Sequence, residues 1–146
     1  MSEHDNRQFS LLLVEDSPAD VFLVKQAMRE QGLNAKIQIA GDGDSAMNII
    51  DHMDDEAGNP CPDIVLLDLN IPKRSGDEVL ERFRQSPKTA NVPVVVMTSS
   101  ESPVDRARAL ELGATEFFQK PSSLAEFMKL GRLVRSIHEH ARRTAA

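Results

Sequence analysis

The sequence predicts an α/β fold in which helices cover both faces of a parallel five-stranded sheet. Apolar runs of strand length alternate with segments of helical periodicity along the 146 residues, which is typical of doubly wound sheets with right-handed crossovers. Two runs, 11–14 and 64–67, end on carboxylates, the first at Glu15 and Asp16 and the second at Asp68. The flavodoxin-like strand order 2-1-3-4-5 makes these two strands neighbours. We therefore expect the three acids to meet at one edge of the sheet.

The first half of the chain supplies the first three strands and two helices. Residues 17–20, Ser-Pro-Ala-Asp, predict a helix start with a serine N-cap and proline at the first helical position, and Gly32 predicts its end. Residues 36–40 alternate apolar and polar side chains, as a half-buried strand near a sheet edge does. Residues 44–53 have apolar side chains at helical spacing. Residues 54–62 are acidic and rich in glycine and proline, which predicts an exposed loop, either a contact surface or a slack connection.

The second half of the chain adds two strands and three helices. A capping-box pattern marks the first of these helix starts, and serine N-caps mark the other two. The predicted elements are a helix over 76–85, a strand over 93–97, a helix over 103–112, a strand over 115–119 and a helix from 124 to about 140. The two strands end on Thr98 and Lys120, at the same edge of the sheet as the acids.

Length, composition and charge restrict the classes of protein. The length fits one domain, and we expect a flexible leader over residues 1–8 and a single domain over 9–146 with no output domain. No run approaches the ~18 apolar residues of a membrane span, and the leader lacks the apolar core of a signal peptide. A net charge of −6 argues against nucleic-acid binding. Because Cys61 is the single cysteine, no disulfide framework exists, and we expect a cytoplasmic protein.

The residues at the strand ends fit phosphoryl transfer. Carboxylates about 4 Å apart repel by roughly 4 kcal/mol at an effective dielectric constant of ~20, and Mg²⁺ compensates such charge while bridging to phosphoryl oxygens. The ammonium of Lys120 and the hydroxyl of Thr98 are suitable partners for a phosphoryl group. Each residue alone is equally consistent with a helix cap, a strand end or a surface position. Together they favour transfer of a phosphoryl group onto the carboxylate of Asp68.

This combination resembles the receiver domain of two-component response regulators, and the resemblance spans residues 8–140. The residues that carry it are Glu15, Asp16, Asp68, Thr98, Lys120 and Pro121. The resemblance implies that Asp68 accepts a phosphoryl group from a histidine kinase or a phosphotransfer protein, and that signalling proceeds by docking. It also implies direct Mg²⁺ binding by Asp16 and Asp68, a contribution of Glu15 through water, and coordination by the backbone carbonyl of Asn70.

The same resemblance assigns roles to the last two strands. In the family, residues at the positions of Thr98 and Lys120 bind the phosphoryl group, and an aromatic side chain on the fifth strand turns inward as the threonine hydroxyl moves. Phe117 occupies that position here. Many relatives have tyrosine there, so this chain lacks the ring hydroxyl that a switch of that kind uses. The bond between Lys120 and Pro121 resembles a cis peptide bond of the family.

A narrower resemblance and the last helix indicate partners. Residues 12–20, the long loop before Asp63 and the extended last helix are most similar to small stand-alone regulators paired with bacterial phytochromes. This implies a phytochrome kinase as a partner. The last helix has more apolar residues than one sheet face buries, among them Leu133 and Ile137, so we expect a homodimer through it. The alternative is that these side chains fold back over the core of a monomer.

Two other functions use similar residues. Phosphatases with an aspartyl nucleophile commonly place a second acid two residues further on, where this chain has Asn70. An amide is no general acid, so we expect no enzyme beyond self-catalysed phosphorylation and dephosphorylation. The third possibility is a pseudo-receiver that binds partners without phosphorylation, although all the acceptor-site residues are present.

Overall fold

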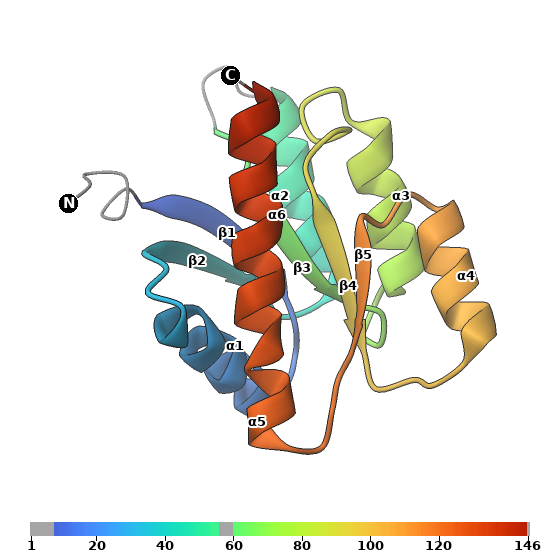
Figure 1. Cartoon of the computed structure of the whole chain (residues 1–146). Coiled ribbons are helices and arrows are strands. Elements are labelled where there is room, and N and C mark those ends of the chain that lie inside the picture. The colour runs from blue at the N-terminus through green and yellow to red at the C-terminus, as the bar shows by residue number, and fades with distance from the viewer. Residues whose placement is uncertain (1–7, 56–59, 146) are drawn as a thin grey trace.

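The structure, a computed structural model, describes residues 8–55 and 60–145. They form a parallel sheet in the order β2-β1-β3-β4-β5, as the sequence predicts, with helices on both faces (Figure 1). The strands are β1 (Phe9–Val14), β2 (Ala35–Ala40), β3 (Ile64–Asp68), β4 (Val94–Thr98) and β5 (Glu116–Gln119). The helices are α1 (Pro18–Glu30), α2 (Gly43–Asp55), α3 (Gly76–Gln85), α4 (Pro103–Glu111), α5 (Leu124–Phe127) and α6 (Lys129–Ala145).

Burial of the strands follows their sequences. β3 and β4 lie inside the sheet and are buried throughout, which explains their unbroken apolar runs. β2 lies at an edge and is partly exposed, as its alternating sequence predicts. Parallel pairing aligns Val14 with Leu67 and Asp68 with Met97. This register brings Glu15, which follows Val14, level with Asp68.

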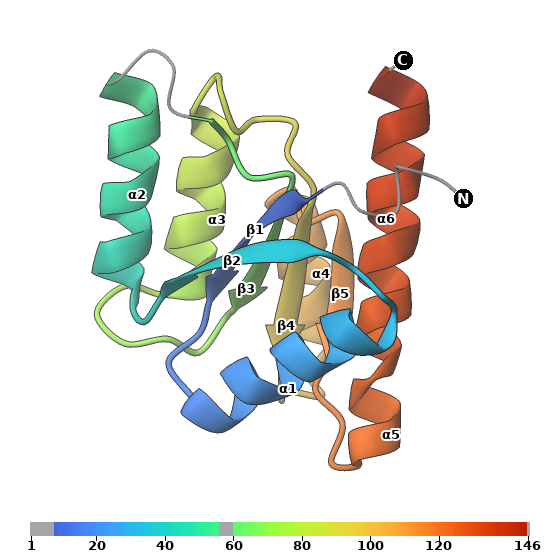
Figure 2. The same cartoon turned by 90° about the vertical axis from the view of Figure 1, so that its left-hand side faces the viewer.

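Two apolar cores lie on opposite faces of the sheet. Helices α1, α5 and α6 cover one face, where Val24, Met28 and Leu130 are buried (Figures 1 and 2). Helices α2, α3 and α4 cover the other face, where Ile50 and Phe83 are buried. Within the described ranges, no helix combines the length and the apolar character that crossing a membrane requires.

The boundaries near the chain start and near the loop after α2 differ from the predicted ones. Strand β1 begins earlier than expected, at Phe9, whose buried ring stacks on His138 with centroids 4.5 Å apart. The predicted leader, residues 1–8, lies outside the described residues except for Gln8. The predicted loop begins two residues too early, because Asp54 and Asp55 belong to α2. Residues 56–59 of that loop also lie outside the described residues.

The last helix is longer than predicted and is interrupted. A turn at Met128 separates α5 from α6, and α6 continues to Ala145 rather than ending near residue 140. After the turn, α6 passes very close to α1. A Cβ atom added at Gly131 would lie 2.3 Å from the backbone oxygen of Ala27 in α1. Only glycine fits at this crossing without moving one helix.

We expect Gly131→Ala to lower the free energy of unfolding by roughly 1–3 kcal/mol, because overpacking against backbone outweighs the better helix propensity of alanine. Gly41→Ala is the matched control, since a Cβ atom there meets nothing within 4 Å. Its stability should stay close to that of the wild type. Chemical denaturation followed by circular dichroism measures both variants, and equal stability of the two would contradict this account of the helix crossing.

Candidate functional site

Three predicted acids meet at the carboxyl ends of β1 and β3. Glu15 follows β1, and Asp68 is the last residue of β3. Both are buried, with 2% and 4% of their surfaces exposed, whereas Asp16 is exposed. One carboxylate oxygen from each of the three residues lies within 4.8 Å of the others. Hard oxygen donors at this spacing fit a divalent cation such as Mg²⁺.

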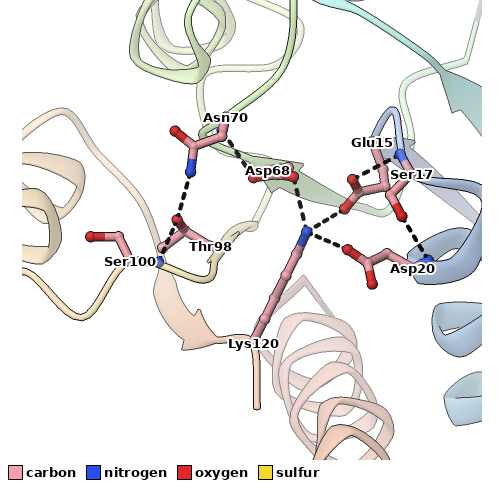
Figure 3. Close-up of polar contacts among 8 residues, drawn as sticks. All are labelled: Glu15, Ser17, Asp20, Asp68, Asn70, Thr98, Ser100 and Lys120. Atoms are coloured by element: carbon pink, nitrogen blue, oxygen red, sulfur yellow. Dashed lines mark hydrogen bonds and ion pairs between the residues drawn. The ribbon is translucent and has the colours of Figure 1, made fainter. Parts of the chain in front are cut away.

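Lys120 enters the same site from the end of β5 (Figure 3). Its ammonium nitrogen Nζ lies 2.8 Å from Glu15 Oε1, 2.9 Å from Asp68 Oδ2 and 2.7 Å from Asp20 Oδ2. These contacts use all three donors of the ammonium. Burial opposes the charge, but the hydrogen bonds to the carboxylates prevail and raise the pKa of Lys120 above its ordinary value. The lysine therefore stays protonated and partly offsets the repulsion among the acids.

Backbone groups fix the carboxylates of Asp68 and Glu15. The N–H group of Asn70 donates to Asp68 Oδ1 at 2.9 Å, and that of Ser17 donates to Glu15 Oε2 at 3.2 Å. The second oxygen of each acid accepts a hydrogen bond from Lys120. Each carboxylate is thus held by one backbone N–H group and by the ammonium of Lys120.

Thr98 is the buried last residue of β4, and its side chain contacts that of Asn70. Its hydroxyl oxygen accepts hydrogen bonds from the Asn70 side chain at 3.3 Å and from the Ser100 N–H group at 3.1 Å (Figure 3). Since a hydroxyl also carries a donor, its proton remains available for an incoming oxygen. Phe117 on β5 packs against the core under α4, where the guanidinium carbon of Arg106 lies 5.6 Å from the ring centroid.

The predicted cis peptide bond between Lys120 and Pro121 is wrong. No peptide bond among the residues that the structure describes is cis. The trans form is favoured by roughly 0.5–1 kcal/mol even before proline. The backbone N–H group of Lys120 donates to the backbone carbonyl oxygen of Thr98 at 2.7 Å, which continues the pairing of β5 with β4. The lysine reaches the carboxylates from this trans backbone.

The contact between Asp20 and Lys120 is not among the predictions from the sequence. Residues 17–20 predict only the start of a helix. A usable signal was present, because the first turn of α1 begins at the edge where β1 ends, and helical side chains tilt toward the N-terminus. An acid in that turn is therefore directed back toward Glu15 and its neighbours.

Burial also changes the acidity of Glu15. Loss of solvent raises the pKa of its carboxyl group from 4.5 to about 7, against the opposing hydrogen bond from Lys120. The negative charge of Asp68 adds to the rise. The charge of Glu15 therefore changes near neutral pH.

Comparison with known proteins agrees with this geometry. Residues 11–131 match the response regulator receiver domain family, so the chain belongs to this family. The response regulator Rcp1 of Synechocystis sp. is 35% identical over 130 residues, which cover 89% of this chain and 88% of the relative.

Two solved structures have the same flavodoxin-like fold. The Mn²⁺-bound form of Rcp1 has a TM-score of 0.77 at 34% identity, covering 88% of this chain and 92% of that chain. The phosphorylated cyanobacterial phytochrome response regulator RcpA has a TM-score of 0.78 at 28% identity, covering 88% of this chain and 91% of that chain.

We compare the free energy of unfolding of the wild type with that of Glu15→Gln. The difference, wild type minus variant, should fall as the pH rises from about 5 to about 8. The folded protein binds the Glu15 proton more tightly than the unfolded chain does. The resulting stabilisation is full below pH 4.5 and is lost as the pH rises through about 7. The relative change should be roughly 2–3 kcal/mol. Urea denaturation at several pH values with a chelator measures it, and parallel pH profiles for the two proteins would contradict it.

Proposed function

We propose that this chain is a two-component response regulator whose Asp68 accepts a phosphoryl group from a histidine kinase or a phosphotransfer protein. An oxygen of Asp68 forms the new P–O bond, the P–N bond of the donor phosphohistidine breaks, and the released imidazole takes up a proton. The observation that carries this proposal is the carboxylate of Asp68, which lies 2.9 Å from the Lys120 ammonium within a cluster of acids. Lysine beside a carboxylate nucleophile supplies the charge that an arriving phosphoryl group requires.

We assign the cation site to Mg²⁺. Asp16 and Asp68 would bind the ion directly, together with the backbone carbonyl of Asn70, and Glu15 would contribute through water. The close oxygens of the three acids support this assignment, as does the Mn²⁺-bound form of the relative Rcp1. The ion would neutralise charge on the phosphoryl oxygens during transfer.

The remaining site residues have roles in holding the phosphoryl group and in signalling. Lys120 pairs with one of its oxygens, and the Thr98 hydroxyl donates to another. Movement of this hydroxyl leaves room for Phe117 to turn inward, without the ring hydroxyl that a tyrosine would offer. Asn70 uses its side-chain amide on Thr98 and has no acidic proton, which argues against a phosphatase. The phosphorylated protein would therefore act by docking rather than by turnover.

The partners follow from the same relatives. RcpA is described as a phytochrome response regulator and was crystallised in its phosphorylated form. We propose a phytochrome-type histidine kinase in the cytoplasm as the phosphodonor of this chain. The net charge of −6 argues against nucleic acid as a partner.

Magnesium together with a small acyl phosphate should add one phosphoryl group to the wild-type protein and none to Asp68→Asn. Asp63→Asn is the matched control, because Asp63 precedes β3 at its opposite end and accepts a hydrogen bond from the Ser10 N–H group. Intact mass measures the uptake with and without a chelator. Uptake by Asp68→Asn equal to that of the wild type would refute the assignment. Steady hydrolysis of a generic phosphate ester would indicate a phosphatase, and no uptake at all would indicate a pseudo-receiver.

We also propose a homodimer that uses α6. Leu133 and Ile137 pack against the core of their own chain but are only partly buried, so part of each side chain is open to a second copy. Leu133→Glu should shift the protein toward monomer while leaving uptake at Asp68 intact. Sedimentation velocity at protein concentrations on the order of tens of micromolar, with and without phosphodonor, measures the shift. A wild type that sediments as a monomer in both conditions would exclude this dimer.

A further inference from the structure

Asp20 holds Lys120 from outside the cluster of acids that fits a cation. Its Oδ2 atom lies 2.7 Å from the lysine nitrogen, as close as the contacts of Glu15 and Asp68 (Figure 3). The oxygens grouped for a cation come from Glu15, Asp16 and Asp68, and Asp20 is not among them. The lysine therefore has two partners inside the cation cluster and one partner outside it.

The two shared partners cannot serve the lysine and a cation equally. Glu15 and Asp68 each give one oxygen to a backbone N–H group and the other oxygen to Lys120. A cation bound directly by Asp68 and through water by Glu15 draws electron density from the same carboxylates and weakens their hydrogen bonds to the ammonium. Because the Lys120 side chain is only 12% exposed, water replaces a lost partner poorly.

Asp20 offers the lysine a carboxylate for which the cation does not compete. From this geometry we infer that Asp20 is a positioning residue that keeps Lys120 beside Asp68 when Mg²⁺ binds Asp68 directly and Glu15 through water. The inference rests on the proposed function of the site. It predicts that Asp20 favours magnesium binding, because its carboxylate still holds the lysine when the ion weakens the contacts of Lys120 with Glu15 and Asp68.

If Asp20 served only to start α1, its contact with Lys120 would have no explanation. Ser17 already caps the helix, because its hydroxyl accepts a hydrogen bond from the Asp20 N–H group. The Asp20 carboxylate turns toward Lys120, at the end of a strand remote in sequence. A helix-start role would affect stability, whereas a positioning role would affect cation binding through Lys120.

The test is calorimetric titration of the full chain with MgCl₂, using a double-mutant cycle between Asp20→Asn and Lys120→Met. Asp20→Asn should weaken magnesium binding roughly tenfold in the wild type, because a nearby charge is lost and the lysine competes harder. In the Lys120→Met background the loss should be about threefold or less, because only the loss of charge remains. Glu126→Gln is the matched control: Glu126 is also an acid in a first helical turn and contacts Lys129 at 2.9 Å. Its affinity should stay within about twofold of the wild type.

The outcomes separate this inference from the function on which it rests. Equal losses in both backgrounds, or no loss in the wild type, overturn the role of Asp20. Phosphoryl uptake measured by intact mass then shows whether the proposed function still stands. A wild type that binds no magnesium and accepts no phosphoryl group overturns both. Circular dichroism of each variant shows whether it is folded, and a folded Asp20→Asn protein with unchanged magnesium affinity is decisive against the inference.

Discussion

The arrangement of acids at the carboxyl edge of the sheet depends on the contacts that the ammonium of Lys120 makes with them. Acids stand at the carboxyl ends of the parallel strands β1 and β3, so Glu15 and Asp68 lie level with each other. Asp20, in the first turn of α1, lies at the same edge. Buried like charges at such spacing repel strongly. Lys120 contacts all three of these carboxylates and thereby makes the arrangement compatible with a stable fold. The same arrangement leaves an excess of negative charge, which favours a divalent cation.

The acids differ in burial, and this difference separates their tasks. Asp16 is exposed and makes no contact with Lys120, since the three donors of the ammonium are already used. It is therefore the acid of this cluster that is open to solvent. Glu15 and Asp68 are buried, and each already accepts a hydrogen bond from Lys120. In the proposed site, a cation would therefore share these two carboxylates with the lysine.

The sequence predicts those parts of the fold that depend on local patterns. Unbroken apolar runs identify β3 and β4, alternation identifies the edge strand β2, and strand-end acids correctly place Glu15 beside Asp68. It fails where tertiary contacts decide. The break at Met128 lies next to the crossing of α6 over α1 at Gly131, which depends on how two helices pack. The peptide bond before Pro121 is trans, and no single dipeptide reveals the isomer.

Helix α1 links the core to the site. Val24 and Met28 bury one side of this helix against the sheet and α6, and Gly131 lets α6 approach the backbone of Ala27. The carboxylate of Asp20 at the start of the helix is therefore held by packing that begins at Val24, about one turn away. Its short side chain has little reach of its own, so a small displacement of α1 would lengthen the contact with Lys120. The same helix thus packs against α6 at Ala27 and contacts Lys120 through Asp20.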